Sequence, residues 1–167
     1  MYKLIKTILI ILFSFYLMIL TQNILFKYTP LLQVISHFDF SFSRENWWRF
    51  NNFIPFKTII FYLFLADINL NIRVNNLAGN IIGFIPFGFI LPLLLKKYFN
   101  LKSILKATFT LSLTYEILQL IFGLGSFDVD DLILNTIGGG LGYLGLRLIK
   151  SIYDLRNKKS VITSKMN

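Results

Sequence analysis

The sequence predicts an all-α integral membrane protein, a bundle of four transmembrane helices with one additional short helix. Three observations predict it: 55% of the 167 residues are hydrophobic, only 15% are charged, and the apolar residues gather in four long runs. A soluble domain of this length carries more charge and shorter apolar runs. The chain has no cysteine and one histidine, which argues against disulfides, a thiolate metal site, a cysteine nucleophile and a multi-histidine metal centre.

Each apolar run is long enough to cross a bilayer, which takes about 20 apolar residues. The expected spans are Thr7–Phe26, Leu77–Leu95, Ser103–Phe122 and Leu132–Ile149. The first run follows Lys3 and Lys6, as the apolar part of a signal peptide would. No small-residue cleavage site follows it, so we expect the run to be retained as an anchor.

A fifth apolar segment, Phe53–Ala66, is shorter than a bilayer crossing and contains Lys57. Its apolar side chains recur at helical spacing, which favours an interfacial or re-entrant helix over a fifth span. A fifth span would also place either Lys96 and Lys97 or the basic C-terminal end on the outer side of the membrane, against the usual charge bias.

Basic residues set the expected orientation, because cytoplasmic loops carry an excess of Lys and Arg. Four spans with both termini in the cytoplasm put most of the 17 basic residues on that side. We expect a multi-pass membrane protein, with one membrane domain over residues 1–153 and a frayed, basic cytoplasmic tail over 154–167. The net charge of +9 indicates contact with anionic lipid, not with nucleic acid. Trp47 and Trp48 in the outer loop suit the headgroup region.

Glu116 is the most unusual residue, since it lies inside the third expected span, one turn before Gln119. A carboxylate at that depth is costly, so it usually faces the bundle interior or a wet cavity. The expected topology brings polar residues of three spans to one depth, near the outer leaflet. We therefore expect an outward-facing polar pocket. Its candidate residues are Asn76, Asn80, Glu116, Gln119, Asp128, Asp131 and Asn135.

Small residues and a proline are expected to shape the bundle. Gly79 and Gly83 are four residues apart, as are Gly138 and Gly142, and this spacing lets membrane helices approach closely. Pro86 is expected to break or kink the second span, which frees backbone carbonyls that a cavity or neighbouring groups must then satisfy.

Four sequence blocks resemble the VanZ-like family, and they occur in the order of that family. The blocks cover residues 52–59, 76–88, 112–119 and 127–139, and together they span roughly residues 50–150. The matching positions are Asn80, Pro86, Glu116, Gln119, Asp128, Asp131, Asn135 and Gly138. Some relatives have an arginine just before the aspartate block, where this chain has Gly125 and Ser126, so a charge pair to Asp128 is not expected here.

The resemblance implies a location in the bacterial cell membrane. It also implies a link to resistance against teicoplanin-type glycopeptide antibiotics, without the change of peptidoglycan precursor that gives vancomycin resistance. Most members of the family have no established biochemical activity. The sequence favours a non-enzymatic envelope protein whose pocket binds, or modulates access to, a lipid-linked wall precursor or a lipoglycopeptide. Membrane lipids are expected partners, a homo-oligomer is left open, and no cofactor is expected.

Two other functions stay open. A metal-dependent membrane enzyme acting on a phosphorylated envelope lipid would use Mg²⁺ or Ca²⁺, held by the hard oxygen ligands of the acidic residues. Those ligands would be Glu116, Asp128, Asp130 and Asp131. The absence of a dedicated nucleophile or histidine base counts against an enzyme. A transporter or channel is less favoured, because four short spans without an internal repeat make a self-contained transporter unlike most known ones.

Overall fold

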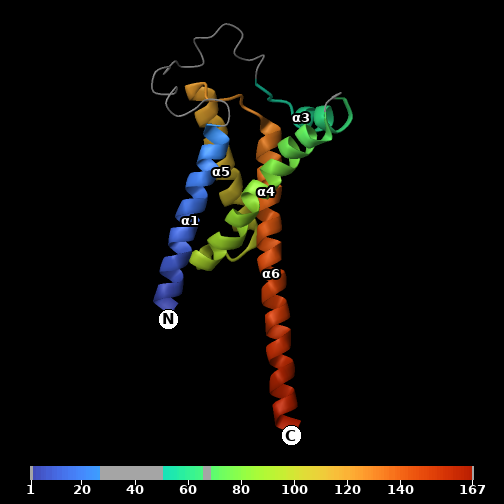
Figure 1. Ribbon diagram of the computed structural model, residues 1–167. Helices are drawn as coiled ribbons and strands as arrows, with labels where there is room; N and C mark the ends of the chain where they lie inside the picture. The colour runs from blue at the N-terminus through green and yellow to red at the C-terminus, as the bar shows by residue number, and fades with distance from the viewer. Residues whose placement is uncertain (1, 27–50, 66–68, 167) are drawn as a thin grey trace.

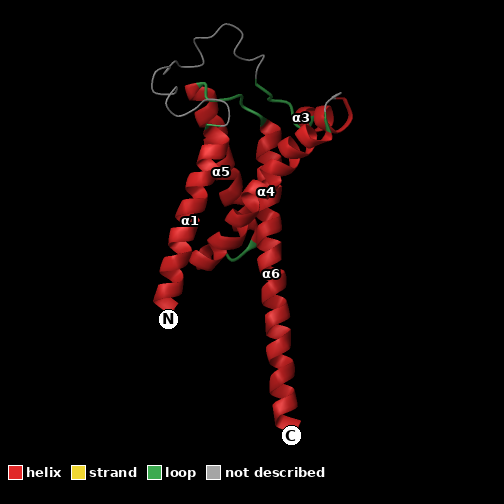
Figure 2. Ribbon diagram, in the orientation of Figure 1, coloured by secondary structure: helices red, strands yellow, loops and turns green. Residues whose placement is uncertain are grey.

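The computed structural model describes residues 2–26, 51–65 and 69–166, and these residues form helices and connections without a strand (Figures 1 and 2). Trp47 and Trp48, which we expected in the headgroup region, lie outside the described residues. In chain order the elements are α1 (Tyr2–Leu25), α3 (Lys57–Ile60), the π-helix η3 (Phe61–Leu65), α4 (Leu70–Leu94), the 3-10 helix η4 (Lys96–Tyr98), α5 (Leu101–Phe122) and α6 (Val129–Met166).

Four of these helices are long and apolar enough to cross a membrane, namely α1, α4, α5 and α6. The predicted fold class is therefore confirmed. The last helix differs from the prediction at its C-terminal end, because it continues past Tyr153 to Met166, where we expected a frayed tail. No glycine or proline follows Gly145 to stop the helix, and the basic residues beyond it are good helix formers that can stay exposed.

Helices α4 and α6 form the centre of the bundle, and glycines on α6 allow their close approach. A side-chain carbon added to Gly138 would overlap the backbone carbonyl of Ile81, and one added to Gly142 would overlap that of Ile85. Small residues are the usual means by which two membrane helices bring their backbones together. The close packing expected at Gly138 and Gly142 is thus present.

The glycine pair on α4 behaves differently. A side-chain carbon on Gly83 would make ordinary contact with Leu20 at 3.6 Å, and one on Gly79 would have nothing within 4 Å. Gly79 is exposed, so it does not serve the close helix packing that its spacing suggested. It lies two residues before Ile81, where α4 meets α6, but a side-chain carbon on it would point into open space.

Helix α1 is largely exposed and packs on the bundle through few side chains. The ring centroids of Phe13 and Phe87 are 5.8 Å apart, and the Tyr16 hydroxyl donates to the Gly83 carbonyl at 2.7 Å. The carbonyl that loses its helical donor to Pro86 is that of Ile82, four residues before the proline. The Tyr16 hydrogen bond goes to the next carbonyl along α4, so it fastens α1 to α4 and does not replace the donor that the proline removes.

The polar candidate residues gather at one end of the bundle. In Figure 1 the first turns of α1 and the last turns of α6 point to the lower end of the molecule, while α3 and the α5–α6 connection lie at the upper end. The connection begins at Gly123, which has a left-handed backbone (φ 62°) that ends α5. Because the chain reverses direction there, the end of α5 and the start of α6 are brought side by side.

We predict that Gly142→Leu lowers the stability of the folded bundle, because the added side chain has only the rigid α4 backbone to meet. The expected loss is about 1–3 kcal/mol, the usual cost of overpacking. Thermal unfolding in detergent measures it. The matched control is Gly145→Leu, since a side-chain carbon at Gly145 has nothing within 4 Å. Equal melting temperatures for the two variants would contradict the close helix contact.

Candidate binding pocket

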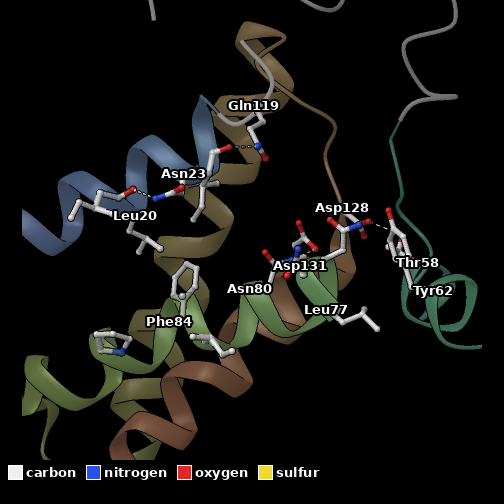
Figure 3. A pocket seen from close by; sticks show the side chains of 18 of the residues that line it. Leu20, Asn23, Thr58, Tyr62, Leu77, Asn80, Phe84, Gln119, Asp128 and Asp131 are labelled. Carbon is white, nitrogen blue, oxygen red and sulfur yellow. Dashed lines mark hydrogen bonds between the residues drawn. The ribbon is translucent and has the colours of Figure 1, made fainter. Parts of the chain in front are cut away.

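A cavity of about 560 Å³ lies at the polar end of the bundle (Figure 3). Five of the seven predicted pocket residues line it, and they come from α4, α5, the α5–α6 connection and the first turn of α6. They are Asn76, Asn80, Gln119, Asp128 and Asp131. The other two, Glu116 and Asn135, lie behind the cavity wall. The mixture of amide, carboxylate and apolar side chains is typical of a site that binds small organic ligands.

The Asn80 and Asp131 side chains meet at the centre of the cavity wall. The Asn80 amide donates to a carboxylate oxygen of Asp131, which links α4 to the first turn of α6 (Figure 3). Both side chains are partly exposed, so each keeps surface that faces the cavity. A polar ligand group in the cavity can therefore reach an amide and a carboxylate whose positions are already fixed.

Glu116 faces the interior of the bundle and is 2% exposed. Its Oε2 accepts a hydrogen bond of 2.7 Å from the backbone N–H of Asp128. A carboxylate that turned to the lipid would lack any such donor. Glu116 thus ties the end of α5 to the first residues of α6, and it supports the cavity from behind instead of lining it.

Asn135 is also buried, at 4% exposure, and its amide donates to the Ser112 hydroxyl at 2.8 Å. It lies one turn further along α6 than Asp131, which carries it past the cavity and into the α5–α6 contact. Its amide oxygen has no hydrogen-bond partner in the described part of the chain. Asn135 joins two helices and does not belong to the cavity lining that we expected it to share.

Asp130 has a role that the sequence did not reveal. Its carboxylate is fully buried and accepts hydrogen bonds from the backbone N–H groups of Phe56, Thr58 and Ile59 at the start of α3. Negative charge there also complements the exposed N–H groups of a helix start. Phe56 holds a left-handed backbone, with φ 66°, and this carboxylate stabilises it.

Asp128 makes a second link between the short segment and α6. Its carboxylate accepts from the Asn52 amide at 2.8 Å and from the Thr58 hydroxyl at 2.6 Å. The backbones also pair, since the Asn52 N–H donates to the Phe127 carbonyl at 2.7 Å and the Val129 N–H to the Asn52 carbonyl at 3.0 Å. The predicted short helix is thus present and is fastened to the start of α6. Asn52 and Thr58 lie in the first family-like block, which was the available signal for this role.

Helix α1 forms one wall of the cavity, whereas we expected the walls to come from the three later spans. Tyr16, Leu20 and Asn23 are among its lining residues. Two side-chain contacts hold this end of α1 against α5: Gln119 donates its amide to the Ile24 carbonyl at 2.9 Å, and the hydroxyls of Thr21 and Tyr115 are 2.8 Å apart. The apolar composition of α1 gave no sign of this, because its few polar residues resemble incidental ones.

Comparison with known proteins now decides the family. The sequence model of the VanZ/LLP1 family matches residues 13–150. The chain belongs to this family. It is also 43% identical over 82 residues to Protein VanZ of Enterococcus faecium, a match that covers 49% of this chain and 46% of that protein. The chain therefore matches about half the length of this curated relative. No solved structure is significantly similar to it.

Membership of the VanZ/LLP1 family confirms the resemblance seen in the four sequence blocks, and with the four apolar helices it establishes a membrane protein. The family match includes the C-terminal half of α1, from residue 13 onward, which the blocks did not. This agrees with the structure, in which α1 supplies part of the cavity wall.

The metal-dependent alternative depends on four carboxylates. Those of Asp128 and Asp130 accept hydrogen bonds from the short segment, and that of Glu116 from the Asp128 backbone. Within the described ranges, no three His, Cys, Asp or Glu side chains are grouped so as to hold a metal ion. A site for Mg²⁺ or Ca²⁺, and with it an enzyme acting on a phosphorylated lipid, stays a prediction.

We predict that Asp130→Asn loosens the short segment. The carboxylate now accepts hydrogen bonds from backbone N–H groups with both of its oxygens, and asparagine would place an NH₂ group, itself a donor, opposite one of them. The expected loss of local stability is about 1.5–3 kcal/mol, the value of a hydrogen bond to a charged group. Amide hydrogen exchange of residues 56–60 in detergent measures it, and faster exchange is expected. Asp154→Asn is the matched control, since Asp154 is exposed on α6; unchanged protection in Asp130→Asn would show that the carboxylate does not anchor the segment.

We predict that Glu116→Gln is tolerated better than Glu116→Ala, because glutamine keeps an oxygen that can accept from the Asp128 backbone. Alanine leaves that buried N–H without a partner, at a cost of about 1–3 kcal/mol. Thermal unfolding of both variants, with antibiotic susceptibility of cells that express them, makes the comparison. Equal damage from the two substitutions would show that the negative charge itself is required.

Proposed function

We propose that this protein binds the polar head of a chain-bearing envelope molecule in the cavity, and that binding reduces susceptibility to teicoplanin-type glycopeptide antibiotics. The molecule is either a lipid-linked wall precursor or an acylated glycopeptide, which share a glycosylated peptide head and a hydrocarbon chain. The observation that carries the proposal is the cavity itself, a polar pocket of about 560 Å³ at one end of four apolar helices.

The chemistry of the cavity supports such a head. Sugars and peptides present many O–H and N–H donors, and the oxygens of Asn80, Asp128 and Asp131, which line the cavity, can accept from them. The amide nitrogens of Asn76 and Gln119 can donate to ligand carbonyls. Because these side chains are already held by one another and by the backbone, little conformational entropy is lost when a ligand binds.

The expected orientation supports an envelope ligand. With the basic ends of the chain in the cytoplasm, the end of the bundle that carries the cavity faces outward. Lipid-linked wall precursors and glycopeptides meet the membrane on that side. The link to teicoplanin-type antibiotics rests on family membership: the resemblance associates the namesake of the family with this resistance, and we propose that this chain shares it.

We predict that Asn80→Ala weakens binding by roughly tenfold or more. The substitution removes the amide that holds the Asp131 carboxylate in place, so the ligand loses a positioned hydrogen bond to that carboxylate. A hydrogen bond to a charged group is worth about 1.5–3 kcal/mol, and each 1.4 kcal/mol is tenfold in affinity. Gly79→Phe is expected to have a similar effect by filling the cavity, since Gly79 lines it and has open space around it. Binding of a fluorescent acylated glycopeptide and of a lipid-linked muropeptide to purified protein measures both effects and separates the two ligands.

Gly145→Phe is the matched control, because this glycine also has open space around it but does not line the cavity. In cells, deletion of the gene should raise susceptibility, and the wild type and Gly145→Phe should restore resistance where Gly79→Phe does not. A membrane-impermeant thiol reagent should label Ser126→Cys from outside the cell. Purified protein that binds neither ligand, or labelling of Ser126→Cys from the cytoplasm alone, would overturn the proposal.

A further inference from the structure

We infer that the hydrocarbon chain of the ligand leaves the polar pocket sideways, through an opening between α1 and α4 that faces the membrane interior. The inference rests on the proposed function and narrows its ligand to an amphiphile with its head and chain in two different parts of one cavity. It also gives α1 a role, as the wall against which the chain lies.

The first step of the argument is where α1 touches α4. The two helices meet near the middle of α1, through the hydrogen bond from Tyr16 to the Gly83 carbonyl and the ring contact of Phe13 with Phe87. The Leu20 side chain lies 3.6 Å from where a side-chain carbon of Gly83 would be. These contacts close the opening at its deeper end.

The second step is where α1 goes beyond that point. Towards its C-terminal end it turns to α5, through the Thr21–Tyr115 pair and the hydrogen bond from Gln119 to Ile24. The N-terminal end of α4 lies near α3 instead. Helices α1 and α4 therefore diverge towards the polar end of the molecule (Figure 1). The cavity is lined from both helices in the space that they leave (Figure 3).

The third step is the chemistry of the lining. Leu20 and Phe84 form a buried apolar wall, whereas Ile19 and Ile82 line the same cavity and are 42% and 62% exposed. Exposed isoleucines on two membrane-spanning helices lie at the depth of the lipid chains. The cavity is therefore apolar where it opens to the membrane and polar near Asn80 and Asp131. A single amphiphile matches both parts, whereas a water-soluble ligand would leave the apolar part to lipid.

The test uses photo-crosslinking with the protein in nanodiscs of phosphatidylglycerol and phosphatidylcholine. Each probe carries one diazirine, either in its head or on its chain, and both a lipid-linked muropeptide and an acylated glycopeptide are made in the two forms. The chain diazirine should label residues around Ile19 and Ile82. It should give at least fivefold less label at Leu148, which is as exposed on α6 as Ile82 is on α4.

Gly79→Phe provides a second measurement, since Gly79 lines the cavity on the α4 side and a side-chain carbon there has nothing within 4 Å. It should reduce chain labelling at Ile19 at least fivefold relative to head labelling in the pocket, while Gly145→Phe leaves that ratio unchanged. Chain label spread evenly over Ile19, Ile82 and Leu148, with head label still in the pocket, would overturn this inference and leave the proposed function standing. Head label outside the pocket would overturn both. Of the two molecules, the lipid-linked muropeptide and the acylated glycopeptide, the ligand is the one whose head probe labels the pocket and whose chain probe labels Ile19 and Ile82.

Discussion

The close contact between α4 and α6 is the constraint on which the rest of this structure depends. At Gly138 and Gly142 there is no side chain to separate the two helices, so their backbones approach as closely as backbones can. This fixes the rotation of α4 about its own axis relative to α6, and so it decides which residues of α4 face the start of α6. Asn80 reaches Asp131 because the contact between Ile81 and Gly138, which lies two turns after Asp131 on α6, holds α4 in this rotation. The polar wall of the cavity is in this sense a product of the glycines.

Buried acidic side chains are tolerated at this end of the molecule because backbone N–H groups surround them. Glu116 accepts from the backbone N–H of Asp128, and Asp130 accepts from three backbone N–H groups of the short segment. A carboxylate with such partners loses less by leaving water than one facing lipid. These residues give the connection between α5 and α6 a fixed shape, on which Asp128 and Asp131 are then presented to the cavity.

The sequence was sufficient for the number of spans and for the end of the bundle at which polar residues gather. Long apolar runs and the charge bias are local properties of the chain, and both depend on few residues at a time. It was not sufficient for the tasks of individual residues. Asn135 and Asp131 lie on one face of α6, yet one helical turn separates a side chain in the α5–α6 contact from one in the cavity. The contribution of α1 to the cavity could not be predicted, because Tyr16 and Thr21 make hydrogen bonds only with residues far away in the chain, apart from one local bond of Thr21.

Helix α6 has 38 residues, and at about 1.5 Å of rise per residue a helix of that size is close to twice as long as the roughly 30 Å of hydrocarbon in a bilayer. Its second half must therefore project into the water as a stiff rod. The charges of Arg156 and Lys158 are then held at a fixed distance from the lipid headgroups, because a helix is stiff and a flexible linker is not. Any partner that recognises these charges would be held at that distance too.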